Sequence, residues 1–265
     1  MSTEKKIRAV SYWVLHPRYA VGKITRDIDA LTRLANKYGS DKGDLWRGRH
    51  HYTRVYDSLF TPVKNKSIKL VEIGLLHRSH TEWRDPTARD QGGQAAAAAP
   101  SLKMWAEFFP YANIYGFDIN DFTQVALDRI TIVQGDAGET RDLSRLVDVV
   151  GGDIDIIIDD ASHASHHQQI ALAFLFEKLK EGGLYIIEDL KAQPPSLERG
   201  DAEKTVDVLK RGIITGSYCT AYIDEQTSDY LSSTIYDIQF FDSIGSDPLS
   251  GNDSIAVLRK KLGSD

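Results

Sequence analysis

Residues 155–163 read DIIIDDASH, in which three isoleucines are followed by two aspartates, an alanine, a serine and a histidine. A near-continuous apolar run of this length is typical of a strand buried on both faces of a parallel sheet. In open sheets of this kind, ligands bind where the strands end. We therefore predict a buried strand at 155–160 that leads into a functional site.

Similar runs occur on both sides of this segment. They are IKLVEIGL (68–75), NIYGFDI (113–119), ITIVQ (130–134) and GLYIIE (183–188). Stretches with helical character fall between them at 102–109, 142–149 and 166–180. Strands that alternate with helices predict βαβ units and a doubly wound α/β sheet.

The pattern changes in the C-terminal part. A predicted helix at 201–214 is followed by two strand-like runs, IYDIQFF (235–241) and SIAVLR (254–259), which a turn-rich stretch joins. A parallel connection needs a dozen or more residues and usually a helix, so these two strands should be antiparallel. A parallel five-stranded core that ends in an antiparallel hairpin predicts the Rossmann-like class I methyltransferase fold.

The N-terminal part, residues 1–63, has a mixed composition with predicted helices at 24–38 and 52–60. We predict that it forms a helical cap on a domain that comprises residues 64–265. Residues 77–100 are polar and alanine-rich, and they are too many for an ordinary loop between a strand and a helix. This segment is either an extended lid over the sheet edge or a mobile loop.

Composition excludes several classes of protein. No apolar run approaches the roughly 20 residues that span a bilayer, and the first residues, MSTEKKIRAV, lack the apolar core of a signal peptide. Cys219 is the single cysteine, which excludes an intramolecular disulfide and fits a reducing compartment. A net charge of −6 argues against a nucleic-acid partner. We expect a cytoplasmic protein without a membrane span.

The ends of the first three predicted strands suit a nucleoside. Gly74 lets the backbone approach a ligand closely. Asp118 can accept hydrogen bonds from ribose hydroxyls, and Asp136 would lie beside an adenine. Each residue alone is also typical of a turn, but the series of three at one sheet edge predicts a nucleoside site. The G-x-G-x-x-G motif of dinucleotide-binding proteins is absent, which argues against NAD(P).

The next two strands end in carboxylates. Asp160, Glu188 and Asp189 should meet at the same edge, and three carboxylates in a dry site require protonation or a cation. Mg²⁺ or a similar hard divalent ion prefers such oxygen ligands. His163 is then placed to take a proton from a metal-bound hydroxyl. The alternative is that these acids only solvate strand ends and cap helices.

Several segments together resemble the metal-dependent sugar O-methyltransferases of natural-product biosynthesis, the group that includes the mycinamicin, demethylmacrocin and rhamnosyl tetracenomycin enzymes. The matching segments are LANKYGSDKG, HHYTRVYDSLF, LVEIGL, SLKMWAEFFPYANIYGFDI, GDAG, DIIIDDASH and GGLYIIEDL. The resemblance implies that S-adenosylmethionine (SAM) is the methyl donor. It implies that Asp160, Glu188 and Asp189 bind Mg²⁺ and that His163 is the general base. It also implies that the SAM site is lined by Glu72, Gly74, Asp118 and Asp136. By the same analogy, the N-terminal segment contacts the cofactor or the substrate through Lys42, His51, Tyr52 and Tyr56.

We therefore expect a SAM-dependent O-methyltransferase that modifies a hydroxyl, most specifically of a sugar on a glycosylated natural product or glycan. Its partner would be a small-molecule or glycan acceptor, and we expect a homo-oligomer. The alternative is a Rossmann protein that does not methylate. An NAD-dependent oxidoreductase or a homologue of the cephalosporin hydroxylases would be such a protein.

Overall fold

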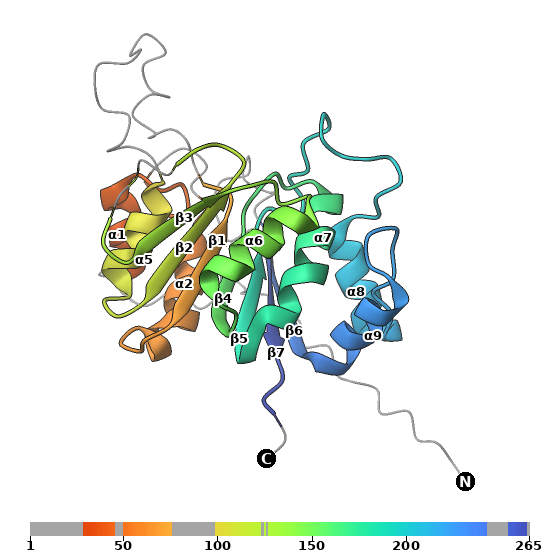
Figure 1. Ribbon diagram of the computed structural model, residues 1–265. Helices are drawn as coiled ribbons and strands as arrows, with labels where there is room; N and C mark the ends of the chain where they lie inside the picture. The colour runs from red at the N-terminus through yellow and green to blue at the C-terminus, as the bar shows by residue number, and fades with distance from the viewer. Residues whose placement is uncertain are drawn as a thin grey trace, which may run out of the picture.

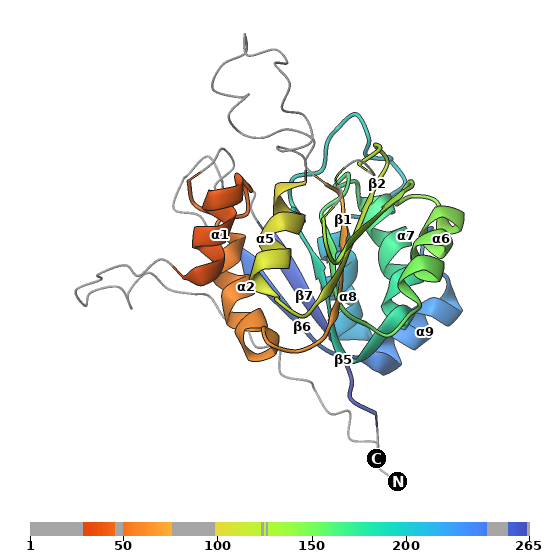
Figure 2. The same ribbon diagram turned by 60° about the vertical axis from the view of Figure 1, so that its left-hand side comes forward.

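The computed structural model describes residues 29–45, 50–75, 99–122, 125, 127–242 and 254–263. Within these ranges the chain forms a seven-stranded sheet that lies between two layers of helices (Figures 1 and 2). The strands are β1 (Lys69–Ile73), β2 (Asn113–Asp118), β3 (Ile130–Gln134), β4 (Ile154–Asp159), β5 (Leu179–Ile187), β6 (Ile235–Asp242) and β7 (Ser254–Lys260).

The order of the strands across the sheet is β3-β2-β1-β4-β5-β7-β6. The first five strands pair in parallel, and β7 is antiparallel to both of its neighbours, β5 and β6. The predicted sheet, with its five parallel strands and its antiparallel pair at the end, is therefore confirmed. Because the chain moves outward from β1 in one direction and then returns to β4, the topological switch point lies between β1 and β4.

The two faces of the sheet are covered by different helices (Figure 2). On one face lie α1 (Ala30–Tyr38), α2 (Tyr52–Phe60) and α5 (Pro100–Phe108). On the other face lie α6 (Thr140–Val150), α7 (Ser165–Leu175), α8 (Thr205–Thr215) and α9 (Glu225–Thr234). Successive side chains of a strand point to opposite faces. In β4, Ile156 and Ile158 accordingly pack in the first core and Ile157 in the second.

The helices predicted from the sequence are present with shifted ends. Helix α2 has the predicted bounds. Helix α1 begins at Ala30, where Asp29 caps it by accepting a hydrogen bond from the Thr32 amide; the earlier residues of the predicted helix lie outside the described part. Helix α7 ends at Leu175, and a single 3₁₀ turn, η3 (Phe176–Lys178), leads into β5, which is longer than predicted. A second 3₁₀ turn, η2 (Thr61–Val63), follows α2.

Helix α9 was not predicted. Its sequence, EQTSDYLSST, buries only Ser228 and Leu231, so it lacks the apolar periodicity that marks an amphipathic helix. Its start does carry a local signal, because the Asp224 carboxylate accepts a hydrogen bond from the Thr227 amide.

The proposed N-terminal cap shares a core with the sheet. Leu31 and Ala35 of α1 and Tyr52 of α2 belong to the same buried cluster as Leu70 of β1. Almost all of the 77–100 segment, for which we expect a lid or a mobile loop, lies outside the described residues. Among the described residues, no helix combines the length and the apolar character needed to cross a membrane.

Candidate active site at the carboxyl edge of the sheet

Neighbouring strands place three predicted site residues next to each other. Gly74, Asp160 and Glu188 directly follow β1, β4 and β5. The hydrogen-bond ladder continues into these residues, since the Asp160 amide donates to the Ile73 carbonyl (2.8 Å) and the Glu188 amide donates to the Asp159 carbonyl (2.9 Å). The register of the sheet therefore holds these backbones together at one edge.

Gly74 is required for this close approach. Its φ is +88°, and a Cβ atom at this position would lie 2.1 Å from the Asp160 carbonyl oxygen. A side chain would both strain the backbone and collide with the end of β4. Gly74 thus allows β1 and β4 to stay in contact where their carboxyl ends open on the site.

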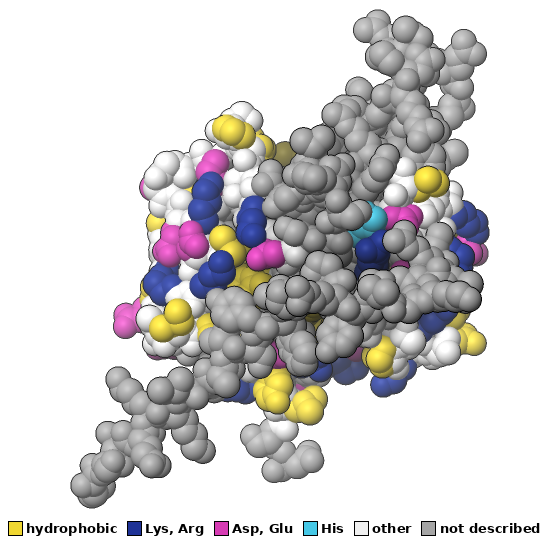
Figure 3. Space-filling model, turned by 180° about the vertical axis from the view of Figure 1, so that it is seen from behind, with side chains coloured by type: hydrophobic (Ala, Val, Ile, Leu, Met, Phe, Trp, Pro, Cys, Tyr) yellow, Lys and Arg dark blue, Asp and Glu magenta, His cyan; other side chains and the backbone are white. Residues whose placement is uncertain are grey.

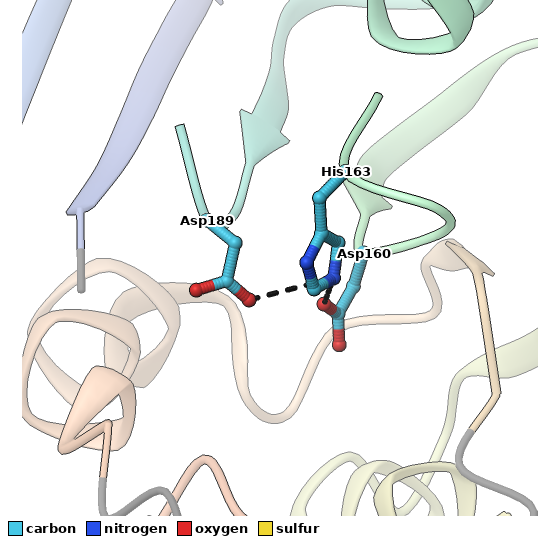
Figure 4. A group of neighbouring side chains, drawn as sticks. All are labelled: Asp160, His163 and Asp189. Carbon is cyan, nitrogen blue, oxygen red and sulfur yellow. Dashed lines mark hydrogen bonds and ion pairs between the residues drawn. The ribbon is translucent and has the colours of Figure 1, made fainter. Parts of the chain in front are cut away.

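Asp160, His163 and Asp189 form a compact cluster (Figure 4). His163 Nε2 lies 3.2 Å from Asp160 Oδ1 and 3.5 Å from Asp189 Oδ2. One ligand atom from each of the three residues lies within 4.8 Å of the others. Two carboxylate oxygens and an imidazole nitrogen at this spacing are a donor set that suits a divalent cation.

Two residues of this cluster have an uncommon backbone conformation. His163 has φ +61° and Asp189 has φ +53°, which are left-handed values that residues other than glycine seldom adopt. Such conformations concentrate at functional sites, where the surrounding structure enforces them. In this arrangement the His163 ring lies between the carboxylates of Asp160 and Asp189 and contacts both (Figure 4).

Lys42 supplies a buried positive charge beside the cluster. Its Nζ atom lies 2.5 Å from Asp160 Oδ2, 2.8 Å from Glu188 Oε2 and 3.5 Å from Glu72 Oε1, and the side chain is 2% exposed. From the sequence we predicted that a divalent cation binds Asp160 and Glu188 and that Lys42 contacts the cofactor or the substrate. Nothing in the local sequence GSDKG indicates that its lysine contacts residues at the ends of β4 and β5.

Tyr52 and Tyr56 also contact carboxylates of the site. The Tyr52 hydroxyl donates to Asp189 Oδ1 at 2.9 Å, and the Tyr56 hydroxyl donates to Glu188 Oε1. We predicted contacts of both tyrosines with the cofactor; in the structure their hydroxyls face the end of β5. His51, which was predicted with them, is buried immediately before α2 with φ +56°.

The charges at this edge perturb one another strongly. Burial lowers the pKa of His163, but its hydrogen bond to Asp160 and the charges of Asp160, Asp189 and Glu188 outweigh burial and raise the pKa to about 9. Burial raises the pKa of Asp160, yet the adjacent Lys42 ammonium and His163 hold it well below its usual value. Strongly shifted groups that gather at one sheet edge are typical of a functional site.

The carboxylates farther inside have raised pKa values. Burial raises the pKa of Glu72 to about 7, although the charge of Lys42 acts in the opposite direction. Burial likewise raises the pKa of Glu188 well above its usual value, and the charge of Asp160 adds to this effect. In both groups the positive charge of Lys42 opposes this rise in pKa.

A cavity of about 380 Å³ lies against the cluster. Five predicted site residues line it: Gly74, Asp118, Asp160, His163 and Asp189. Asp41 and His50, which we did not predict, line it as well, together with Leu75, Ala161 and Ala192. The end of β1 and the cluster of Asp160, His163 and Asp189, which we call the metal-type cluster, therefore share one cavity. The cavity is large enough to hold part of a small-molecule ligand.

The remaining predicted cofactor residues differ in position. Asp118 lies at the cavity, where its Oδ2 accepts a hydrogen bond from the Leu75 amide at 2.7 Å. Asp136 is not among the lining residues; its Oδ1 accepts from the Gly138 amide at 2.8 Å and so shapes a turn. Glu72 is fully buried beneath the site, and its Oε2 accepts from Trp105 Nε1 at 3.1 Å.

The described part of the face shown in Figure 3 carries mixed charges. On the face shown in Figure 3, Lys and Arg side chains are interspersed with Asp and Glu among the described residues. A nucleic-acid-binding protein typically presents a continuous basic stripe. The described part of this face shows no such stripe, which agrees with the net charge of the chain.

Comparison with known sequences identifies relatives of one kind. The chain is 35% identical over 201 residues to 8-demethyl-8-alpha-L-rhamnosyl tetracenomycin-C 2'-O-methyltransferase of Streptomyces olivaceus. The aligned region covers 74% of this chain and 48% of the relative. The chain is 36% identical over 160 residues to mycinamicin VI 2''-O-methyltransferase of Micromonospora griseorubida, covering 60% and 36% of the two chains. The chain thus spans about half the length of the first relative, or less for the second. No protein-family model matches it.

Comparison with solved structures agrees with this result. The MycE methyltransferase from the mycinamycin biosynthetic pathway, in complex with Mg and SAH, superposes with a TM-score of 0.64 and 27% identity over 88% of this chain and 55% of that one. Its complex with Mg, SAH and mycinamycin VI gives a TM-score of 0.62 at the same identity and coverage.

Proposed function

We propose that this chain, which has the class I methyltransferase fold and resembles the sugar O-methyltransferases of antibiotic pathways, is a SAM-dependent O-methyltransferase. Its acceptor would be a hydroxyl of a sugar on a glycosylated natural product or glycan. The observation that carries this proposal is the cluster of Asp160, His163 and Asp189 in a cavity that Gly74 and Asp118 also line.

Gly74 and Asp118 are suited to hold SAM. The left-handed backbone at Gly74 exposes the end of β1 to the cavity, and Asp118 presents a carboxylate at the end of the neighbouring strand β2. A carboxylate in this position accepts hydrogen bonds from ribose hydroxyls in nucleotide-binding sheets. The crystal structures of MycE in complex with Mg and SAH support the same cofactor. Roles for Glu72 and Asp136 near the adenosine or methionine part belong to this proposal.

The carboxylates fit a magnesium ion. Asp160 and Asp189 line the cavity, Glu188 is bonded to Lys42 beside them, and each carboxylate has lone pairs that its present partners leave available. We propose Asp160, Glu188 and Asp189 as the ligands of Mg²⁺. Bound Mg²⁺ would supply positive charge that lowers the pKa of an acceptor hydroxyl.

His163 would act as the general base. Its imidazole lines the cavity, and its hydrogen bond to Asp160 fixes the orientation of the ring. In its neutral form it takes the proton of the acceptor hydroxyl. The acceptor oxygen then forms a bond to the methyl carbon of SAM, the bond between that carbon and sulfur breaks, and S-adenosylhomocysteine (SAH) is the second product.

Calorimetry with SAH, NAD⁺ and NADP⁺ tests the cofactor class. We expect binding of SAH alone, because the cavity is lined by the ends of β1 and β2 without a G-x-G-x-x-G loop. Binding of NAD⁺ without SAH would instead identify an oxidoreductase. The acceptor class is tested by incubation with labelled SAM and a panel of glycosylated macrolides, glycosylated polyketides and free glycans. Assembly as a homo-oligomer and a cytoplasmic location remain predictions, which light scattering and fractionation would measure.

A further inference from the structure

Two tyrosines of one helix contact two consecutive carboxylates. Tyr52 and Tyr56 are four residues apart on α2, so they lie on the same face of the helix. The first donates its hydroxyl hydrogen to Asp189 and the second to Glu188. Both tyrosine side chains are fully buried.

Each hydroxyl occupies one oxygen of its carboxylate and leaves the other oxygen directed elsewhere. Tyr52 binds Asp189 Oδ1, while Asp189 Oδ2 lies 3.5 Å from His163 Nε2 at the cavity. Tyr56 binds Glu188 Oε1, while Glu188 Oε2 lies 2.8 Å from the Lys42 ammonium. The two hydrogen bonds therefore fix the rotation of both carboxylates at the end of β5.

We propose that Tyr52 and Tyr56 are positioning residues of the metal site, and not cofactor contacts. The proposed ligands of the metal all come from the ends of β4 and β5. By orienting Asp189 and Glu188, the two tyrosines of α2 would make the N-terminal part of the chain contribute to the same site. This inference rests on the proposed function, because it requires that these carboxylates bind a divalent ion. Partners that orient ligands are commonly worth about 10–100-fold in metal affinity.

The rings of the two tyrosines have separate packing roles. The Tyr56 ring meets the Trp105 ring edge to face, with centroids 5.5 Å apart, and it stacks on Phe60 at 5.2 Å. The Tyr52 ring stacks on His50 with centroids 5.1 Å apart. Phenylalanine keeps these ring contacts and removes only the hydroxyl, so Tyr52→Phe and Tyr56→Phe isolate the hydrogen bonds to the carboxylates.

Tyr185 provides a matched control. It is also fully buried, and its hydroxyl donates at 3.3 Å to the carboxylate of Asp159, the residue that precedes Asp160. Asp159 is not part of the metal-type cluster. Tyr185→Phe therefore removes a buried bond between a tyrosine and an aspartate from the same sheet without touching Glu188 or Asp189.

The test is the affinity of the full chain for Mn²⁺, measured by electron paramagnetic resonance at fixed pH without SAM or acceptor. We expect Tyr52→Phe and Tyr56→Phe each to weaken Mn²⁺ binding about 10–100-fold, and Tyr185→Phe to bind within about twofold of wild type. The midpoint of thermal unfolding is recorded for every variant, so that a loss of folded protein is separated from a loss of affinity.

Three results would overturn the inference, and they are distinguishable. Wild-type affinity in both Tyr52→Phe and Tyr56→Phe would show that the hydroxyls do not position the ligands, while the metal site itself would stand. An equal loss in Tyr185→Phe would show a general effect of buried hydroxyls on the fold. Absence of Mn²⁺ binding in the wild-type protein would contradict the metal part of the proposed function and with it this inference.

Discussion

The ammonium of Lys42 lies 2.5 Å from Oδ2 of Asp160, although the two residues are 118 positions apart in the sequence. This contact and the neighbouring contact with Glu188 place a positive charge beside two carboxylates at the ends of β4 and β5. Lys42 thereby opposes the negative charge of Asp160 and Glu188 from a buried position.

Replacement of Lys42 by methionine should destabilise the protein by about 3–5 kcal/mol, because it leaves buried carboxylates without their partner. Chemical denaturation at neutral pH in the absence of divalent ions measures this loss. Lys37→Met is the control, because Lys37 pairs with Glu107 at an exposed position and its removal should leave the stability close to wild type. Equal stabilities of the two variants would show that the Lys42 ion pairs do not contribute.

Gly74→Ala should destabilise the junction of β1 and β4. The added Cβ would lie 2.1 Å from the Asp160 carbonyl oxygen, and alanine also disfavours the φ of +88°. We expect a loss of about 2–4 kcal/mol, the sum of overpacking and backbone strain. Gly152→Ala separates these effects, because φ is +66° there but no atom lies within 4 Å of the new Cβ. A loss in Gly74→Ala no larger than in Gly152→Ala would remove the steric argument.

Asp118→Ala should weaken SAH binding about 10²-fold. In the proposed complex the variant would remove the hydrogen bonds that the charged carboxylate accepts from the ribose hydroxyls, each worth about 1.5–3 kcal/mol, and such losses are seldom fully additive. Isothermal titration calorimetry measures the change, with circular dichroism to verify that the loop at Leu75, which Asp118 also holds, remains folded. Unchanged affinity for SAH would place the ribose elsewhere.

The imidazole of His163 should titrate near pH 9 in the metal-free protein, as measured by NMR. The folded-state pKa lies above the unfolded value of about 6.5. The contribution of His163 to the free energy of unfolding is therefore complete below pH 6.5 and is lost as the pH rises through 9. Mg²⁺ should lower this pKa, because a cation beside Asp160 opposes protonation of the ring. A metal-free pKa near 6.5 would contradict the arrangement of His163 with Asp160 and Asp189.

Much of the sheet was predictable because its signals are local. The apolar runs that become β1 to β4 identify the strands, although β3 at the sheet edge is only partly buried, and the short turn-rich connection before β7 predicts its antiparallel pairing. Since parallel strands share one carboxyl edge, the same runs predicted that Asp160, Glu188 and Asp189 would gather there. The missed helix α9 has almost no apolar periodicity, so its position depends on tertiary packing of Leu231.

The partners of the site residues were not predictable in the same way. Lys42, Tyr52 and Tyr56 lie more than a hundred positions from the carboxylates that they contact at the ends of β4 and β5. Neither spacing nor composition indicates which side of the site they face. Asp136 shows a different difficulty: its position after a strand predicts a cofactor contact, which stays a prediction, while the structure adds that its carboxylate accepts a hydrogen bond from the Gly138 amide. Whether a strand-end carboxylate points to a ligand or to its own backbone depends on loop geometry.

The most direct test of the proposed mechanism is the rate of transfer of a labelled methyl group from SAM to a glycosylated acceptor, measured with Mg²⁺, with EDTA and in His163→Ala. We expect EDTA to abolish transfer and added Mg²⁺ to restore it. We expect His163→Ala to retain SAH and Mn²⁺ binding while its rate falls about 10²–10⁴-fold, the usual worth of a positioned general base. Asp160→Asn should lower both Mn²⁺ affinity and rate, because it replaces a charged oxygen ligand. Methyl transfer that continues in EDTA, with His163→Ala near the wild-type rate, would contradict this account.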